Sequence, residues 1–188
     1  MSACLKAQSQ TINTQIKLLQ HKWLMRTYIT PETLNKWSPD VPDLCVKCLT
    51  KKGTLIHCVW ECPKSMDFWT RVICTLSTIT GTQVPCITKL CILGVYPDRF
   101  HVNSKCKTLI NFSLLQARRM IALSWRETEM PSSKSWIREM SMCVTLEKLT
   151  HIVRGKAQEF EEIWTPLMDF LQEFEEIWTP LMDFLKQQ

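Results

Sequence analysis

Glycine is scarce in this chain, with only four residues among 188. So few glycines argue against a loop-rich protein and against a β-sandwich, which need many tight turns. Hydrophobic residues make up 45% of the chain, and this fraction excludes wholesale disorder. The composition therefore favours a packed, mainly α protein of one ordinary domain or two small ones.

Long apolar runs are also missing. No stretch approaches the roughly 20 apolar residues that a membrane-spanning helix needs, and residues 1–6 lead into a polar stretch without the apolar core of a signal peptide. We therefore expect no membrane partner and a cytoplasmic or nuclear location. Thiols stay reduced there, so the ten cysteines are expected to be metal ligands or small core residues rather than disulfides.

The net charge of +5 conceals an uneven distribution. Residues 158–188 contain eight acidic residues and one lysine, a charge of −7, so residues 1–157 keep 22 basic and 10 acidic residues, a charge of +12. A body this basic suits a polyanionic partner, because each lysine or arginine that docks on a phosphate releases condensed counterions. The alternative is that these residues only keep the surface soluble.

One short stretch carries a metal-ligand pattern. Cys45 and Cys48 form a Cys-x-x-Cys pair, a basic loop with one glycine follows, and His57 and Cys62 complete four ligand-type side chains. Zinc prefers a tetrahedral shell of thiolate sulfur and imidazole nitrogen, and four protein ligands are typical of a structural site. The stretch therefore predicts a small zinc-knuckle loop inserted in an irregular helical domain.

Two alternatives accompany this interpretation. A Cys-x-x-Cys pair also occurs in thioredoxin-like redox proteins, but the strand–helix context of such a pair is absent here. Cys58 adjoins His57 and is the other candidate for the third ligand. We favour His57.

Hydrophobic residues at helical spacing predict a series of helices. They cover approximately residues 12–29, 31–37, 63–81, 104–127 and 132–155. Thr30-Pro31-Glu32 is typical of a helix start, with an N-cap, a proline at the first helical position and an acidic first turn. The apolar segment 85–95 fits a short helix or a strand, and we favour the helix.

The end of the chain repeats itself. The fourteen residues 158–171 (QEFEEIWTPLMDFL) recur unchanged as residues 172–185. Two copies are too few for a solenoid, which needs about three units, and complete identity is typical of a recent tandem duplication. We predict an acidic amphipathic helix that kinks near Pro180, and we give the second copy little functional weight.

The predicted organisation has four segments. They are an N-terminal helical segment (1–42), a zinc knuckle (43–64), a helical body (65–157) and the acidic, tandem-repeated tail (158–188).

Several stretches resemble one family. Residues 21–34 (HKWLMRTYITPETL) precede the cysteine cluster, and residues 53–62 (GTLIHCVWEC) complete it. Further similar stretches are Phe68-Trp69, QARRMIA at 116–122, WIREM at 136–140, LEK at 146–148, and Phe160 with Trp164-Thr165-Pro166. In their order and spacing, over roughly residues 15–171, they resemble the C-terminal region of the LINE-type non-LTR retrotransposon polyprotein.

The resemblance implies a region that lies downstream of a reverse transcriptase, binds RNA and supports target-primed reverse transcription. It also implies Cys45, Cys48, His57 and Cys62 as zinc ligands, with His57 rather than Cys58 in third place. The chain departs from the polyprotein because it has no consecutive aspartates, and so lacks the polymerase's Asp-Asp motif, and because its tail is duplicated. An endonuclease domain does not fit into what remains, so we expect a detached piece that is not an enzyme.

These observations lead to a functional hypothesis. The chain is expected to bind RNA, or single-stranded DNA, with a reverse-transcriptase domain in trans as a further partner and no small-molecule substrate. The candidate nucleic-acid contacts are Lys47, Lys51, Lys52, Trp60, Lys64, Arg118 and Arg119. Trp60 equally fits packing under the metal loop, and Arg118-Arg119 is expected to point outward from its helix. The alternatives are a remnant that acts only as a protein-interaction module and a chain without selected function.

Overall fold

The computed structural model describes residues 14–186, and within them the chain is mainly helical. The elements in chain order are α2 (Thr14–Leu24), α3 (Pro31–Trp37), the π-helical turn η1 (His57–Glu61), α4 (Pro63–Thr80), α5 (Thr88–Leu93), α6 (Ser104–Leu123), α7 (Ser133–Val153) and α8 (Ala157–Lys186). The described residues contain no β-strand, only a single antiparallel bridge between Leu44 and Lys52. The prediction of a mainly α protein is confirmed.

Side-chain caps set the starts of three helices. Thr30, Asn103 and Ser132 each accept a hydrogen bond from the backbone N–H three residues further on, at 3.2, 2.8 and 3.0 Å, and so begin α3, α6 and α7. Gly81 ends α4 with a φ of 61°, a left-handed conformation that glycine adopts without steric cost. Local sequence therefore sets these boundaries, and the predicted N-cap at Thr30 is confirmed.

Two helices are shorter than the hydrophobic pattern predicts. The helix expected over 12–29 is α2, Thr14–Leu24, and Ile12 lies outside the described residues. The helix expected over 104–127 ends at Leu123, because the chain turns there and offers backbone carbonyls to Lys47 of the cysteine-rich hairpin (residues 43–53). The segment 85–95 contains the short helix α5, so the preference for helix over strand is confirmed.

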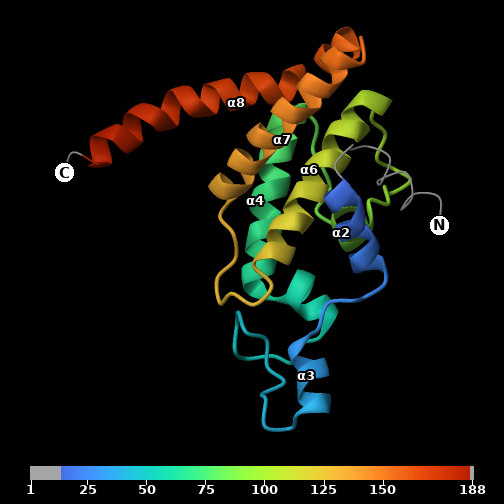
Figure 1. Cartoon of the computed structure of the whole chain (residues 1–188), viewed down its shortest axis with the longest axis vertical. Helices are drawn as coiled ribbons and strands as arrows, with labels where there is room; N and C mark the ends of the chain where they lie inside the picture. Colours follow the sequence, from blue (N-terminus) through green and yellow to red (C-terminus); the bar gives the residue numbers. More distant parts are fainter. Residues whose placement is uncertain (1–13, 187–188) are drawn as a thin grey trace.

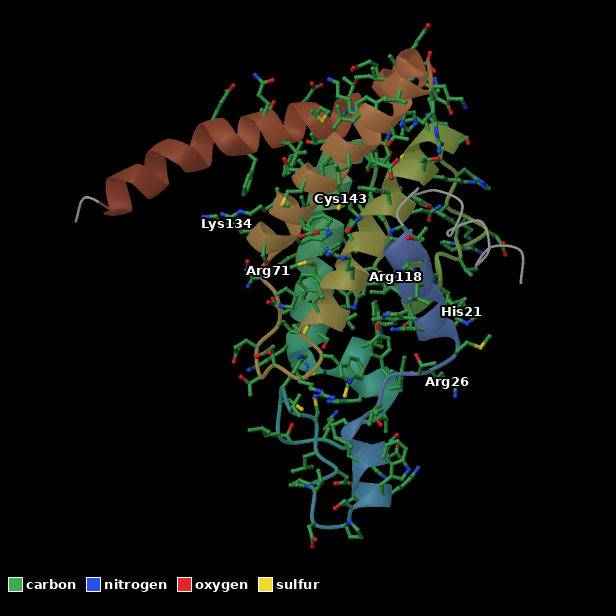
Figure 2. The ribbon with its side chains drawn as sticks, viewed as in Figure 1. His21, Arg26, Arg71, Arg118, Lys134 and Cys143 are labelled. Carbon is green, nitrogen blue, oxygen red and sulfur yellow. The ribbon has the colours of Figure 1, made fainter. Side chains whose placement is uncertain are left out.

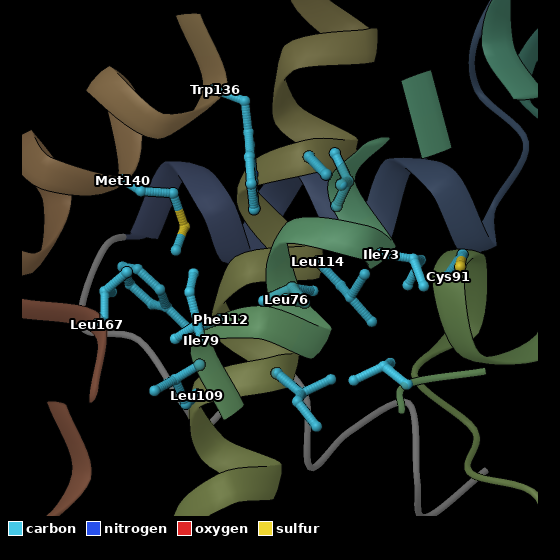
Figure 3. Packing of buried hydrophobic residues seen from close by; sticks show 14 of the residues in the cluster. Ile73, Leu76, Ile79, Cys91, Leu109, Phe112, Leu114, Trp136, Met140 and Leu167 are labelled. Carbon is cyan, nitrogen blue, oxygen red and sulfur yellow. The ribbon is translucent and has the colours of Figure 1, made fainter. Parts of the chain in front are cut away.

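Helix α6 is the centre of the bundle. Helices α2, α4, α5, α7 and α8 all pack against it, and Figure 1 shows it running between α4 and α2. Every residue from Leu109 to Arg118 is buried. In the core, Phe112 and Leu114 of α6 lie among Leu76 of α4 and Trp136 of α7 (Figure 3).

The cysteine-rich hairpin and α8 lie at opposite ends of the bundle. Figure 1 shows the hairpin with α3 below the long helices and α8 crossing above them. One hydrophobic cluster runs from Trp23 of α2 to Leu171 of α8. The predicted segments 1–42, 65–157 and 158–188 therefore contribute to a single core.

The first copy of the repeated sequence is part of that core. Phe160, Trp164 and Leu167 are only 1–2% exposed, and the Trp164 ring meets Phe112 edge to face at a centroid separation of 4.7 Å. Helix α8 continues through Pro166 and Pro180 without interruption. The predicted helix is therefore present, and Pro180 does not divide it into two helices. Its second half extends past the bundle (Figure 1).

A buried and an exposed tryptophan provide a matched pair of substitutions. We expect Trp164→Ala to lower the free energy of unfolding by about 3–5 kcal/mol, because it leaves a cavity beside Phe112. Trp37→Ala, at a tryptophan of α3 that is 68% exposed, is expected to stay within about 0.5 kcal/mol. Chemical denaturation followed by circular dichroism measures both. A small loss for Trp164→Ala would show that the second copy replaces the first in the core.

Candidate metal centre

A short hairpin positions the first two ligand residues. The backbone N–H of Cys45 donates to the carbonyl of Lys51 at 2.8 Å, and that of Gly53 donates to the carbonyl of Asp43 at 2.7 Å. The chain reverses between Cys45 and Lys51. Within this turn Leu49 adopts a φ of 56°, and its N–H donates to the Cys45 carbonyl at 2.8 Å. The hairpin thus closes the Cys-x-x-Cys turn tightly enough for both sulfurs to face the same point.

A π-helical turn positions the other two ligands. Residues five apart lie about 140° apart around an α-helix and so point to different sides. In η1 the N–H of Cys62 instead donates to the carbonyl of His57 at 2.8 Å, the i→i+5 bond of a π-helix. The wider turn brings His57 and Cys62 to one side, toward the hairpin. The sequence predicted both ligands but not this backbone conformation.

The four ligand atoms form a compact group. The nearest ring nitrogen of His57 and the sulfurs of Cys45, Cys48 and Cys62 all lie within 4.8 Å of one another. The sulfurs of Cys45 and Cys62 are 4.0 Å apart, and Cys48 Sγ lies 3.3 Å from His57 Nε2. Metal–ligand bonds of about 2.0–2.3 Å at tetrahedral angles place ligand atoms roughly 3.3–3.8 Å apart. The predicted set therefore has the size of a metal site.

Local hydrogen bonds favour the thiolate of Cys48. Burial alone raises the pKa of this thiol, but hydrogen bonds from the Thr50 side chain, from the backbone of Thr50 and Lys51 and from His57 lower the pKa to about 5. Metal ions bind the thiolate rather than the thiol. Cys48 is thus prepared as a ligand by its own hairpin.

Cys58 lies beside the centre but differs in character. It is buried with Cys45 and Cys62 in a small sulfur-rich cluster. Burial, together with the neighbouring Cys45, raises the pKa of Cys58 to about 12. Burial raises the pKa of Cys62 as well, so position rather than protonation distinguishes the two thiols, and Cys58 is outside the compact group that includes His57. The geometry thus favours His57 over Cys58 as the third ligand.

Lys47 joins the hairpin to the helical body. It is 5% exposed, and its Nζ donates to the backbone carbonyls of Ser124 and Glu127, both at 2.8 Å. Burial lowers the pKa of this ammonium, while the neighbouring thiols, Cys45 first among them, act in the opposite direction. The prediction that Lys47 contacts nucleic acid is therefore wrong, because its charge is used inside the protein to hold the α6–α7 loop.

Helix α3 closes the hairpin from the other side. A Cβ at Gly53 would lie 2.6 Å from Cγ of Pro31, so only glycine allows this approach. The Glu32 N–H donates to the Gly53 carbonyl at 3.3 Å, and the carboxylate of Glu32 lies 3.3 Å from the ammonium of Lys52. The hairpin is thus held between α3 and the α6–α7 loop.

Two of the other candidate nucleic-acid contacts of the hairpin region have protein partners. Lys64 donates to the Thr128 carbonyl at 3.1 Å and pairs with Glu129 at 2.6 Å. Lys52 pairs with Glu32, as above, and Lys51 is exposed without an ion pair among the described residues. Trp60 is half-buried against Trp69 at a centroid separation of 6.2 Å, which is the packing alternative.

The two arginines of α6 do not point outward together. Arg118 is fully buried within the bundle (Figure 2), where its Nε donates to the Leu114 carbonyl at 3.1 Å and its Nη1 to the Ile92 carbonyl at 2.7 Å. Arg119 is half-buried and pairs with Glu139 of α7. The outward orientation is wrong because a helix surrounded by five others has no exposed face at this height.

Other basic residues near the hairpin are exposed. Lys22 and Arg26 lie at the end of α2 (Arg26 is labelled in Figure 2), and Arg126 lies in the loop after α6. Lys22 and Arg126 line the same cavity as Cys45 and Lys47 of the hairpin. Lys22 and Arg126 lie near the hairpin only because of the way in which α2 and α6 pack. The sequence alone shows no more than the basic character of residues 1–157.

The fold and the site define a class. This is a mainly helical protein with a cluster of three cysteines and one histidine that could hold a metal ion. No protein-family model matches the chain. Among the described residues, none of the helices combines the length and the apolar character of a bilayer-spanning segment.

The ligand set can be tested by metal content. We expect about one equivalent of tightly bound metal per chain, and its loss in Cys48→Ser and His57→Ala, because four ligands are needed to complete the shell. Cys74→Ser, at an exposed cysteine of α4, is the matched control and should keep the metal. Elemental analysis of the purified proteins measures this. Full metal content in His57→Ala would identify Cys58 as the third ligand.

Lys47 can be tested separately from the metal. Lys47→Met removes the ammonium and both of its hydrogen bonds, and a hydrogen bond from a charged donor contributes about 1.5–3 kcal/mol. We expect a loss of that size in the free energy of unfolding, against less than about 0.5 kcal/mol for Lys51→Met at the exposed neighbouring lysine. Equal small effects in denaturation would mean that the hairpin does not depend on this contact.

Proposed function

We propose that this protein is a zinc-stabilised, non-catalytic RNA-binding module of the kind that the resemblance to the retrotransposon polyprotein implies. The observation that carries the proposal is the compact group of Cys45, Cys48, His57 and Cys62. Zinc is the proposed ion because three thiolates and one imidazole form a soft, tetrahedral donor set, and it would supply structural stability there rather than reactivity.

The cationic surface supports the proposal of RNA as the partner. Exposed basic side chains lie on several parts of the chain: Lys22 on α2, Arg26 just after it, Lys51 on the hairpin, and Arg126 after α6. None of these four has an ion pair among the described residues. Unpaired cations on one side of a body with a charge of +12 favour a polyanion, because their charge is not cancelled within the protein.

The acidic helix α8 favours a second candidate function. It carries the charge of −7 of residues 158–188 at the end of the bundle opposite the hairpin, and its second half extends past the bundle (Figure 1). A protein-interaction module, including one that docks onto a reverse-transcriptase domain in trans, would use this helix. Removal of residues 172–188 should abolish such an interaction and leave RNA binding unchanged.

The RNA proposal predicts a salt-dependent affinity. Fluorescence anisotropy with a single-stranded RNA should give a linear fall of log affinity with log salt, and Arg26→Gln and Lys51→Gln should each reduce the slope by about 0.7, because each removes about one phosphate contact. Arg71→Gln is the control, since Arg71 on α4 pairs with Asp67 and lies away from the hairpin (Figure 2). Affinity that does not change with salt would contradict the proposal.

Removal of the metal tests which part of the fold the ion stabilises and which part the hydrophobic core stabilises without it. We expect a chelator to unfold residues 43–62 locally and to spare most of the helical circular dichroism signal, because the large cluster of buried residues lies in the bundle. Weaker RNA binding should accompany this local unfolding. Complete loss of the helical signal on chelation would show that the bundle depends on the ion.

A further inference from the structure

A cavity of about 490 Å³ lies between the end of α2, the start of α3, the hairpin and the loop after α6. Its size is within the range of about 300–1,000 Å³ that is usual for small-molecule sites, and it suits one nucleoside rather than a folded polymer. No sequence signal indicates it, because its walls come from four separate parts of the chain.

The walls of the cavity are aromatic and apolar. The rings of Tyr28 and Trp125 lie 5.0 Å apart at an angle of 44°, and Ile29, Pro31 and Leu34 also line the cavity. The Nε1 of Trp125 donates to the Ile29 carbonyl at 2.8 Å, so its orientation is fixed. Such surfaces accept the flat face of an unstacked base.

The rim of the cavity is cationic. Lys22 and Arg126 line it and are exposed, and no acidic residue is among its lining residues. The third basic residue of the lining, Lys47, is already bonded to two backbone carbonyls. An apolar floor with two available cations above it matches a base with a phosphate attached, whereas an apolar peptide would leave those cations without a counter-charge.

We propose that this cavity binds a single unstacked nucleotide of a bound RNA strand, with the base against Tyr28 and Trp125 and its phosphate beside Lys22 and Arg126. The inference rests on the proposed RNA-binding function and names the part of the surface that reads a base. Cys45 and Cys58 form part of the cavity wall, so the nucleotide site and the metal centre share one structure. Metal removal should therefore weaken base binding as well.

Filling the cavity tests the proposal. Ile29→Trp adds a large side chain to its wall without changing a charge, and Ile56→Trp makes the same change at a site of equal exposure, 44%, outside the cavity. By anisotropy with oligouridylate, we expect Ile29→Trp to lose about tenfold in affinity and Ile56→Trp to match the wild type. An abasic oligonucleotide of the same length should bind the wild type about tenfold more weakly, a comparison that needs no variant.

The outcomes separate this inference from the proposed function. Equal binding of both oligonucleotides to the wild type, or of oligouridylate to Ile29→Trp and the wild type, overturns the base site, while salt-dependent RNA binding would stand. The cavity would then suit an apolar side chain of a protein partner. If the wild type binds no RNA, titration with uridine 5′-monophosphate followed by NMR decides: shifts at Tyr28 and Trp125 that Ile29→Trp abolishes support the site, and their absence overturns it.

Discussion

The end of the protein that carries the candidate metal centre depends on the convergence of three thiols and one imidazole. Two short backbone features achieve it, a hairpin that closes the pair Cys45 and Cys48 and a π-helical turn that aligns His57 with Cys62. Buried thiolates repel one another, so a cation at their centre provides what the protein's own groups cannot. The zinc ion that we propose would stabilise this end of the protein.

A few contacts attach the candidate metal centre to the helical bundle. The ammonium of Lys47 is bonded to the loop after α6, and Gly53 packs on Pro31 of α3. These contacts place the hairpin against α2 and Trp125, where the proposed nucleotide cavity forms. A structural metal site and a binding surface thus depend on the same few contacts, although they use different residues.

Sequence patterns predicted individual elements better than their surroundings. The capping signals of α3, α4 and α7 and the ligand spacing act within a few residues, so they could be interpreted locally. Arg118 shows the limit of such an interpretation: an arginine in an amphipathic pattern is normally solvated, but here five helices enclose α6. The burial of Phe160 and Trp164 was missed for the same reason, because the repeated sequence does not show which neighbours its side chains meet.

The sequence by itself determined the helical class, the four ligand residues and the contrast between a basic body and an acidic end, because composition, spacing and charge are properties of the chain. Only the tertiary structure decided which cations remain exposed, that Phe160 and Trp164 enter the core, and that Tyr28 and Trp125 meet. These depend on contacts between residues far apart in the chain, which local propensity does not specify.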